Sequence, residues 1–443
     1  MRLRRRSRAG QAARRGRACQ ETPRGAPRLS NALRKRAFRV SRPALQVDAL
    51  AALVARVAAE VDAGAVLDVG AGQGFLAQAL ALRYGLRVLA LDAVAPLAAA
   101  ADARGARVAA AAARCACRVV VPPRAVAARF AWEAPAQAAA SLEALVRDAL
   151  PQEHGSRQPR VVLVGLHACG DLTPNLCRAF AASDTAAALV VVGCCYNLLT
   201  EAGGGDVDGS GEERAAADSV LDATAAAGSG CVAPREPPAC DAPPGFPLSA
   251  AAASLRLQLG RDARMLACQS GERWATPQGA PSARTTAGHV FRAAMDVVLC
   301  RYFPGTRKDA LSSSREAASA FEPACLGAAA EPDECAAFAA AAHAALAAAG
   351  LDAHRAPEAE LHAAWRDELA PRAHLLPAFC ALRAALAALL ESLIALDRLL
   401  FLREAMGGEG TADACCVLPV FDPARSPRNL ALVARKPSRL PDA

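Results

Sequence analysis

Aromatic side chains are scarce in this chain, at 4% of its 443 residues, so stacking surfaces for single-stranded nucleic acid are not evident. Long uncharged apolar runs are also missing. The best candidate, residues 382–402, is interrupted by Glu391, Asp397 and Arg398. Because a membrane helix needs about 20 apolar residues, we expect a soluble protein with no membrane partner.

The sixteen cysteines lack the spacing of a zinc ribbon, because no C-x-x-C pair occurs among them. The one C-x-C pair, Cys115 and Cys117, lies in an alanine-rich region without nearby histidines. No secretory signal is evident and many cysteines lie in apolar runs, which favours reduced thiols. We therefore expect an intracellular protein, cytoplasmic or nuclear, that holds no metal.

Positive charge is concentrated in residues 1–40, which contain thirteen arginines and Lys35 against Glu21 alone. The whole chain carries +8, so residues 41–443 are mildly acidic with a net charge of −5. An arginine-rich, acid-poor start is typical of an organelle-targeting segment, a nuclear or nucleic-acid-binding tail, or a disordered tail without a specific role. Translation from a start codon placed too early would also produce it.

A glycine-rich turn follows a predicted buried strand at residues 65–69. The turn contains Gly70, Gly72 and Gly74 after Asp68, so its backbone can approach a ligand closely, and the next helix begins with free amide groups. A second predicted strand ends at Asp92, 24 residues after Asp68, near the spacing of about 20 that places an acid on ribose hydroxyls. The pattern predicts a site for an adenosine-bearing cofactor.

The details of the turn favour S-adenosylmethionine over a dinucleotide. A dinucleotide fingerprint is G-x-G-x-x-G and faces a pyrophosphate. Here the glycines alternate, and Asp68 would repel a pyrophosphate but suits the ammonium group of a methionine moiety. The pattern D-x-G-x-G-x-G resembles motif I of class I methyltransferases. We expect Asp68 and the three glycines to hold the methionine part and Asp92 the ribose.

The remaining pattern predicts a doubly wound α/β fold, in which apolar runs alternate with helical segments. We expect helices at residues 45–61, 75–84, 141–150 and 171–180, and strands at residues 65–69, 87–91, 118–121, 161–166, 187–192, 415–421 and 429–434.

Two neighbouring strands of the predicted sheet end in chemically active side chains. In open parallel sheets ligands bind at the carboxyl ends of the strands. We therefore treat the side chains at these ends as candidate catalytic groups: His167, Cys169, Asp171, Cys194, Cys195 and Tyr196. The alternative is that they cap a helix and fill core space, since cysteine is often buried. A zinc site made of His167 and the three cysteines is a further alternative, which spacing alone does not support.

These two strand ends resemble the paired motifs of the methyltransferase-like 25 family, whose relatives include a protein named for an rRNA adenine dimethylase-like domain. The resemblance rests on residues 164–173 (VGLHACGDLT) and 192–197 (VGCCYN), and on three later segments at residues 245–249, 263–269 and 419–433. It implies a seven-stranded class I methyltransferase sheet with a helical insertion before the last two strands.

Within that frame the chain divides into five parts. We expect a basic tail or targeting segment at residues 1–40, a cofactor-binding core at 41–200 and a flexible insertion at 201–245. A helical substrate-side insertion at 246–405 and a strand pair at 406–436 complete the chain. Oligomeric state and stable partners are not readable from the sequence.

The methyl acceptor stays open. No N-P-P-Y or N-L-P-F motif of adenine amino-methyltransferases occurs in the chain, so the dimethylase label finds no support in the residues. Some tRNA 2′-O-methyltransferases have a similar His-x-Cys-Gly strand end, which makes RNA a candidate acceptor. RNA cytosine-5 methyltransferases use cysteines at these two strand ends, which Cys169 with Cys194 or Cys195 could imitate.

The competing interpretation is a non-catalytic scaffold that keeps the cofactor-binding fold. Residues 43–47 (PALQV) stand where the family usually has Lys-Lys and His-Glu-Val, which gives this interpretation some support.

Overall fold

A computed structural model describes residues 42–114, 121–130, 135–149, 160–202, 243–269, 283–306, 332–407, 413–423 and 426–437. The arginine-rich residues 1–40, most of the predicted flexible insertion, and both Cys115 and Cys117 lie outside these ranges.

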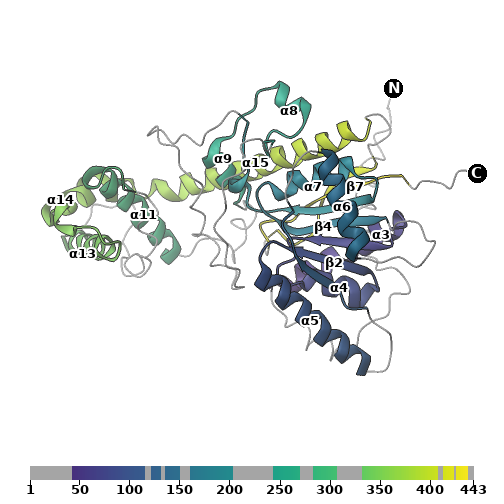
Figure 1. Cartoon of the computed structure of the whole chain (residues 1–443). Helices are drawn as coiled ribbons and strands as arrows, with labels where there is room; N and C mark the ends of the chain where they lie inside the picture. The colour runs from purple at the N-terminus through teal and green to yellow at the C-terminus, as the bar shows by residue number, and fades with distance from the viewer. Residues whose placement is uncertain are drawn as a thin grey trace, which may run out of the picture.

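The described chain builds one seven-stranded sheet in the order β3-β2-β1-β4-β5-β7-β6 (Figure 1). Only β7 runs against its neighbours, because it pairs antiparallel with both β5 and β6 while the other pairs are parallel. The strands are β1 Ala65–Val69, β2 Arg87–Asp92, β3 Arg124–Ala127, β4 Val161–Ala168, β5 Ala186–Gly193, β6 Cys415–Pro419 and β7 Leu430–Arg435. This order and the helical segment before the last two strands confirm the predicted class I methyltransferase fold.

Helices cover both faces of the sheet because alternate strand residues point to opposite faces. On one face Val66, Val162 and Val190 pack with α3 Arg42–Glu60 and α4 Phe75–Tyr84. On the other face Leu67, Leu163 and Leu189 pack with α6 Pro135–Ala149 and α7 Leu172–Ala182. Every residue of β1 and β5 is buried, as expected of central strands in a doubly wound sheet.

The third strand was predicted at residues 118–121, of which residues 118–120 lie outside the described ranges. The structure places β3 at Arg124–Ala127, where Leu89 to Asp92 of β2 pair with it. This edge strand has four residues and none is buried, so its sequence lacks the apolar run on which the prediction relied. The other predicted strands overlap the observed ones, and β4 extends to Ala168, so that His167 belongs to the strand itself.

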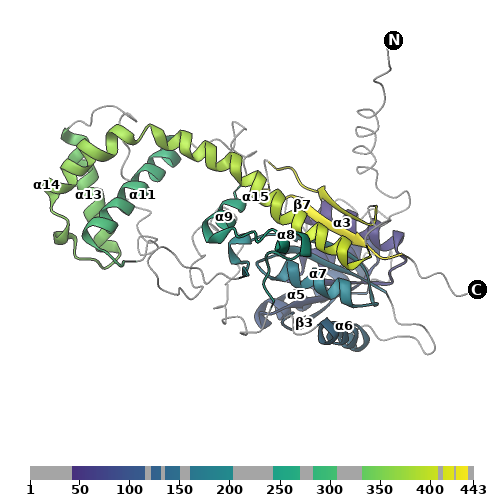
Figure 2. The same cartoon turned by 90° about the horizontal axis from the view of Figure 1, so that it is seen from above.

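The helical insertion divides into two parts (Figure 2). The first part lies against the sheet and contains α8 Ala250–Ser254, α9 Gly260–Ala267 and the C-terminal half of α15 Leu375–Ala405. The second is a lobe away from the sheet, made of α11 Ala283–Tyr302, α13 Pro332–Ala348 and α14 Glu358–Ala363. The lobe has its own core, in which Phe338 stacks on Trp365 at 4.7 Å between ring centroids.

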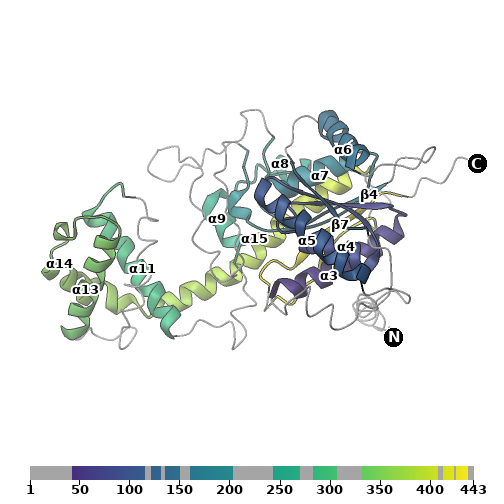
Figure 3. The ribbon, with the colours of Figure 1, turned by 60° about the horizontal axis from the view of Figure 1, so that its bottom comes forward.

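Helix α15 joins the lobe to the sheet (Figure 3). Among the described helices it alone is long and apolar enough to cross a membrane by length and composition, a test that core helices of soluble proteins also pass. Its first half leaves Leu382 and Leu389 exposed. Its second half buries Glu391, Asp397 and Arg398, the same charges that interrupt the apolar run in the sequence.

Asp397 attaches α15 to the segment that precedes α8. Its carboxylate accepts hydrogen bonds from the amides of Leu248 and Ser249, at 2.8 and 2.9 Å, and from the Ser249 hydroxyl at 2.7 Å. Asp397 is 2% exposed, so water cannot replace these bonds.

We expect Asp397→Ala to lower the free energy of unfolding by about 3 kcal/mol, because buried amides that lose an acceptor cost roughly 1–3 kcal/mol each. Urea unfolding followed by circular dichroism measures the change. Asp367→Ala is the matched control, because Asp367 pairs with Arg366 at the surface and exposed pairs contribute little. Equal midpoints for the two variants would contradict the anchoring role of Asp397.

Candidate functional site

The glycine turn between β1 and α4 has the conformation that a close ligand requires. Gly70, Gly72 and Gly74 all have positive φ, at 72°, 54° and 72°. A Cβ at Gly72 would meet nothing within 4 Å, so this backbone faces open space. A Cβ at Gly74 would lie 2.8 Å from Ala101 of α5 Ala95–Arg114, so this glycine lets two helices pack closely. In this turn Gly72 thus leaves room for a ligand to approach the backbone, and Gly74 allows α4 and α5 to pack closely.

Asp92, at the end of β2, holds the turn in place. Its carboxylate accepts hydrogen bonds from the Gly72 amide at 2.7 Å and from the Val94 amide at 2.9 Å. The amides of Gly70 and Ala71 bond to the Leu91 carbonyl, each at 2.9 Å. The predicted ribose-binding acid therefore lies beside the open face of the turn, and a carboxylate has further lone pairs for hydroxyl donors.

Asp68 lies beneath the same turn and is 1% exposed. The Ala77 amide donates to its carboxylate, but Oδ2 has no hydrogen-bond partner. Burial raises the pKa of Asp68 to about 7, and the negative charge of Asp92 adds to this rise. An acceptor without a donor fits the cationic group that the sequence analysis assigned to it. These residues therefore fit the expected methyl donor.

The ends of β4 and β5 bring three cysteines together. The sulfur atoms of Cys169, Cys194 and Cys195 all lie within 4.8 Å of one another, and the last two are 3.8 Å apart. Cys169 is exposed and the other two are half-buried. Hydrogen bonds from the two neighbouring thiols lower the pKa of Cys169, because they stabilise its thiolate.

His167 lies near the end of β4, two residues before Cys169, and the residue as a whole is exposed. Burial of the imidazole lowers its pKa, and the nearby Cys195 opposes this effect. The imidazole is therefore neutral at pH 7 and can accept a proton.

Asp171 was predicted to act on an acceptor, but the structure gives its carboxylate a local partner. Oδ1 accepts a hydrogen bond from the Thr200 amide at 2.8 Å, and the Thr200 hydroxyl accepts one from the Gly245 amide at 2.8 Å. A Cβ at Gly245 would collide with Oδ1. Asp171 thus connects the end of β4 to two later segments of the chain.

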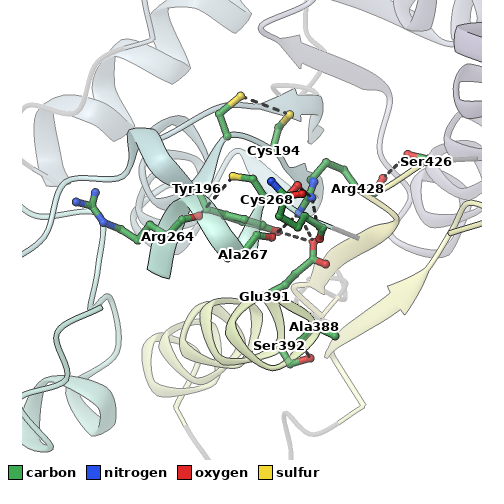
Figure 4. Close-up of polar contacts among 12 residues, drawn as sticks. Cys194, Tyr196, Arg264, Ala267, Cys268, Ala388, Glu391, Ser392, Ser426 and Arg428 are labelled. Atoms are coloured by element: carbon green, nitrogen blue, oxygen red, sulfur yellow. Dashed lines mark hydrogen bonds and ion pairs between the residues drawn. The ribbon is translucent and has the colours of Figure 1, made fainter. Parts of the chain in front are cut away.

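Tyr196, also predicted as catalytic, is buried within the fold. It is 3% exposed, and its hydroxyl donates to Glu391 of α15 at 3.1 Å (Figure 4). The guanidinium groups of Arg398 and Arg428 lie over its ring, at 5.2 and 5.5 Å from the centroid. Burial raises the pKa of the phenol, so it stays protonated. In this arrangement Tyr196 connects the end of β5 to α15.

Arg428 is a residue of this region that the sequence analysis did not single out. It is 5% exposed and donates to Glu391 at 3.1 Å, to the Ala267 carbonyl at 2.7 Å, and to the carbonyls of Cys268 and Gln269 (Figure 4). The sequence did mark this residue indirectly, because Arg428 and the carbonyl groups that it binds lie in two of the segments that carry the family resemblance. Sequence alone gave no reason to bring these segments together.

Comparisons with known proteins agree with this geometry. A family model described as "Methyltransferase domain" matches residues 44–202, which include all the predicted cofactor-binding and strand-end residues. The "Probable methyltransferase-like protein 25" of mouse and that of human are each 29% identical over 275 residues. The aligned region is 62% of this chain but 37% of either relative, so the chain spans little more than a third of their length. The chain thus contains a methyltransferase domain and is similar to methyltransferase-like protein 25.

Proposed function

We propose that this chain binds S-adenosylmethionine and transfers its methyl group to an acceptor at the ends of β4 and β5. The glycine turn carries the proposal: Gly72 faces open space, Asp92 lies beside it, and the buried Asp68 offers an acceptor without a donor. When bound, the cofactor supplies an electrophilic methyl carbon. Asp92 would hold the ribose hydroxyls, and Asp68 would face the positive charge of the methionine part.

His167 is the residue that we expect to act on the methyl acceptor. Methyl transfer depends mainly on in-line positioning, and the acceptor must also lose a proton. A neutral, exposed imidazole at the end of β4 suits this step. RNA is the first acceptor class to test, because the strand ends resemble those of tRNA 2′-O-methyltransferases.

A scaffold without methyl transfer is the second candidate, and a specific observation favours it. Asp171 and Tyr196, two of the six predicted catalytic side chains, make hydrogen bonds within the fold. If the strand ends are structural, the chain binds the cofactor and transfers nothing.

Asp92→Ala is expected to weaken S-adenosylmethionine binding at least 30-fold, because hydrogen bonds to a charged group contribute about 1.5–3 kcal/mol each. Isothermal titration calorimetry measures the dissociation constant. Asp148→Ala, in the exposed last turn of α6, is the control and should bind like the wild type. If Asp92→Ala binds the cofactor as tightly as the wild type, Asp92 does not contribute to the cofactor site.

Cofactor affinity should also fall with pH below about 7. Below pH 7 Asp68 is mostly protonated in the free protein. The positively charged cofactor needs the ionised carboxylate, so its binding must displace a proton from Asp68. The dissociation constant should then rise by up to tenfold per pH unit between pH 7 and pH 6. Calorimetry at the two values measures it, and Asp68→Asn should show a much smaller change. The same pH dependence in Asp68→Asn would show that another group titrates.

Transfer of the tritiated methyl group into a cell extract tests catalysis. After the reaction the extract is separated into RNA, protein and small molecules. We expect the tritium label in one of these fractions, and the RNA fraction is tested first. His167→Ala should reduce the rate at least tenfold, because proton transfer by a positioned side chain typically contributes 10²–10⁴-fold. Cofactor binding without label in any fraction would favour the scaffold instead.

A further inference from the structure

The three cysteines at the ends of β4 and β5 occupy a rigid part of the fold. Ala168 and Gly193, the last residues of the two strands, are paired in the sheet. Just beyond them the Gly170 amide donates to the Cys195 carbonyl at 3.2 Å, which joins the two strand ends again. Tyr196 then anchors the chain after Cys195 to α15. The sulfur atoms are therefore held by backbone on both sides and not by a free surface loop.

Their separation matches a particular kind of ligand. Zinc binds thiolates at about 2.3 Å in tetrahedral geometry, so two sulfurs on one zinc ion lie about 3.8 Å apart. Cys194 and Cys195 are separated by 3.8 Å, and all three sulfurs lie within 4.8 Å. Small side-chain movements would bring Cys169 to the same spacing. A disulfide needs sulfurs at about 2.05 Å, so the arrangement is that of free thiols.

We propose that Cys169, Cys194 and Cys195 bind one zinc ion. Three protein ligands leave the fourth tetrahedral position to water or an external ligand, which is the pattern of catalytic zinc sites; structural sites use four protein ligands. The exposed Cys169 gives the ion a path of entry. His167, the fourth member of the group considered in the sequence, is not part of the cluster in the structure.

The surroundings also suit this site. Zinc with three thiolates carries one net negative charge, and the positive Arg428 interacts electrostatically with Cys195. Arg428 is itself fixed by Glu391 and the main-chain carbonyls of residues 267–269, so its charge stays in place. The proposal does not depend on methyl transfer, because it concerns metal binding by side chains outside the glycine turn.

Metal content of the purified full-length chain tests the proposal. The protein is incubated with zinc sulfate, desalted and analysed by inductively coupled plasma mass spectrometry. We expect Cys169→Ser, Cys194→Ser and Cys195→Ser each to lose one zinc ion per chain relative to the wild type. Cys300→Ser is the control, because Cys300 is an exposed cysteine on α11 in the helical lobe, and it should retain that ion. Equal zinc in all four variants would overturn the site.

A second measurement uses the wild type alone, so it holds even if a variant fails to fold. Iodoacetamide labelling is read peptide by peptide with and without zinc. We expect zinc to slow alkylation of Cys169, Cys194 and Cys195 at least tenfold, with no effect on Cys300, and a chelator to restore the rate. Alkylation of the three cysteines at the same rate with and without zinc would reject the proposal.

Discussion

The arrangement of the helical insertion against the sheet depends on the hydrogen bonds and the ion pair of the buried Arg428 guanidinium. A buried charge is costly unless it is paired and its hydrogen bonds are satisfied, and removal of a partner typically costs 3–5 kcal/mol. Arg428 meets this requirement with Glu391 of α15 and with main-chain carbonyls at the end of α9. Arg428 lies two residues before β7, so this buried charge joins β7 to α9 and α15.

Tyr196 extends this constraint to the strand ends. Its ring lies near both Arg398 and Arg428, and its hydroxyl donates to the carboxylate that also pairs with Arg428. Cys194 and Cys195 directly precede it in the chain. The end of β5 is thus fixed by a buried polar network that includes Glu391 and Arg428. This explains why a phenol that the sequence analysis placed among the catalytic groups is turned toward the helix.

Features of this fold that depend on neighbouring residues were predictable from the sequence, and contacts between residues far apart in the sequence were not. The glycine turn, β1 and α4 follow from the 20 consecutive residues 65–84, and the structure places them as expected. The edge strand β3 was not predicted at Arg124–Ala127, because this short sequence carries no buried apolar run. The orientation of Tyr196 depends on Glu391, 195 residues away, and on Arg428. An apolar helix that contains Glu391, Asp397 and Arg398 was the available signal, since such charges need buried partners.

The sheet register explains how a glycine turn on β1 and side chains on β4 can belong to one site. Asp68 of β1 pairs with Val164 of β4, so β4 continues for four more residues, to Ala168. A register shift between Gly165 and Ala168 shortens this end of β4, so at about 3.3 Å per residue His167 lies less than about 10 Å beyond the level of Asp68. β1 ends at Val69, one residue after Asp68, and the glycine turn follows it. A molecule lying over the turn would therefore extend toward the level of His167 and Cys169, and an acceptor would approach it from the side of β4 and β5.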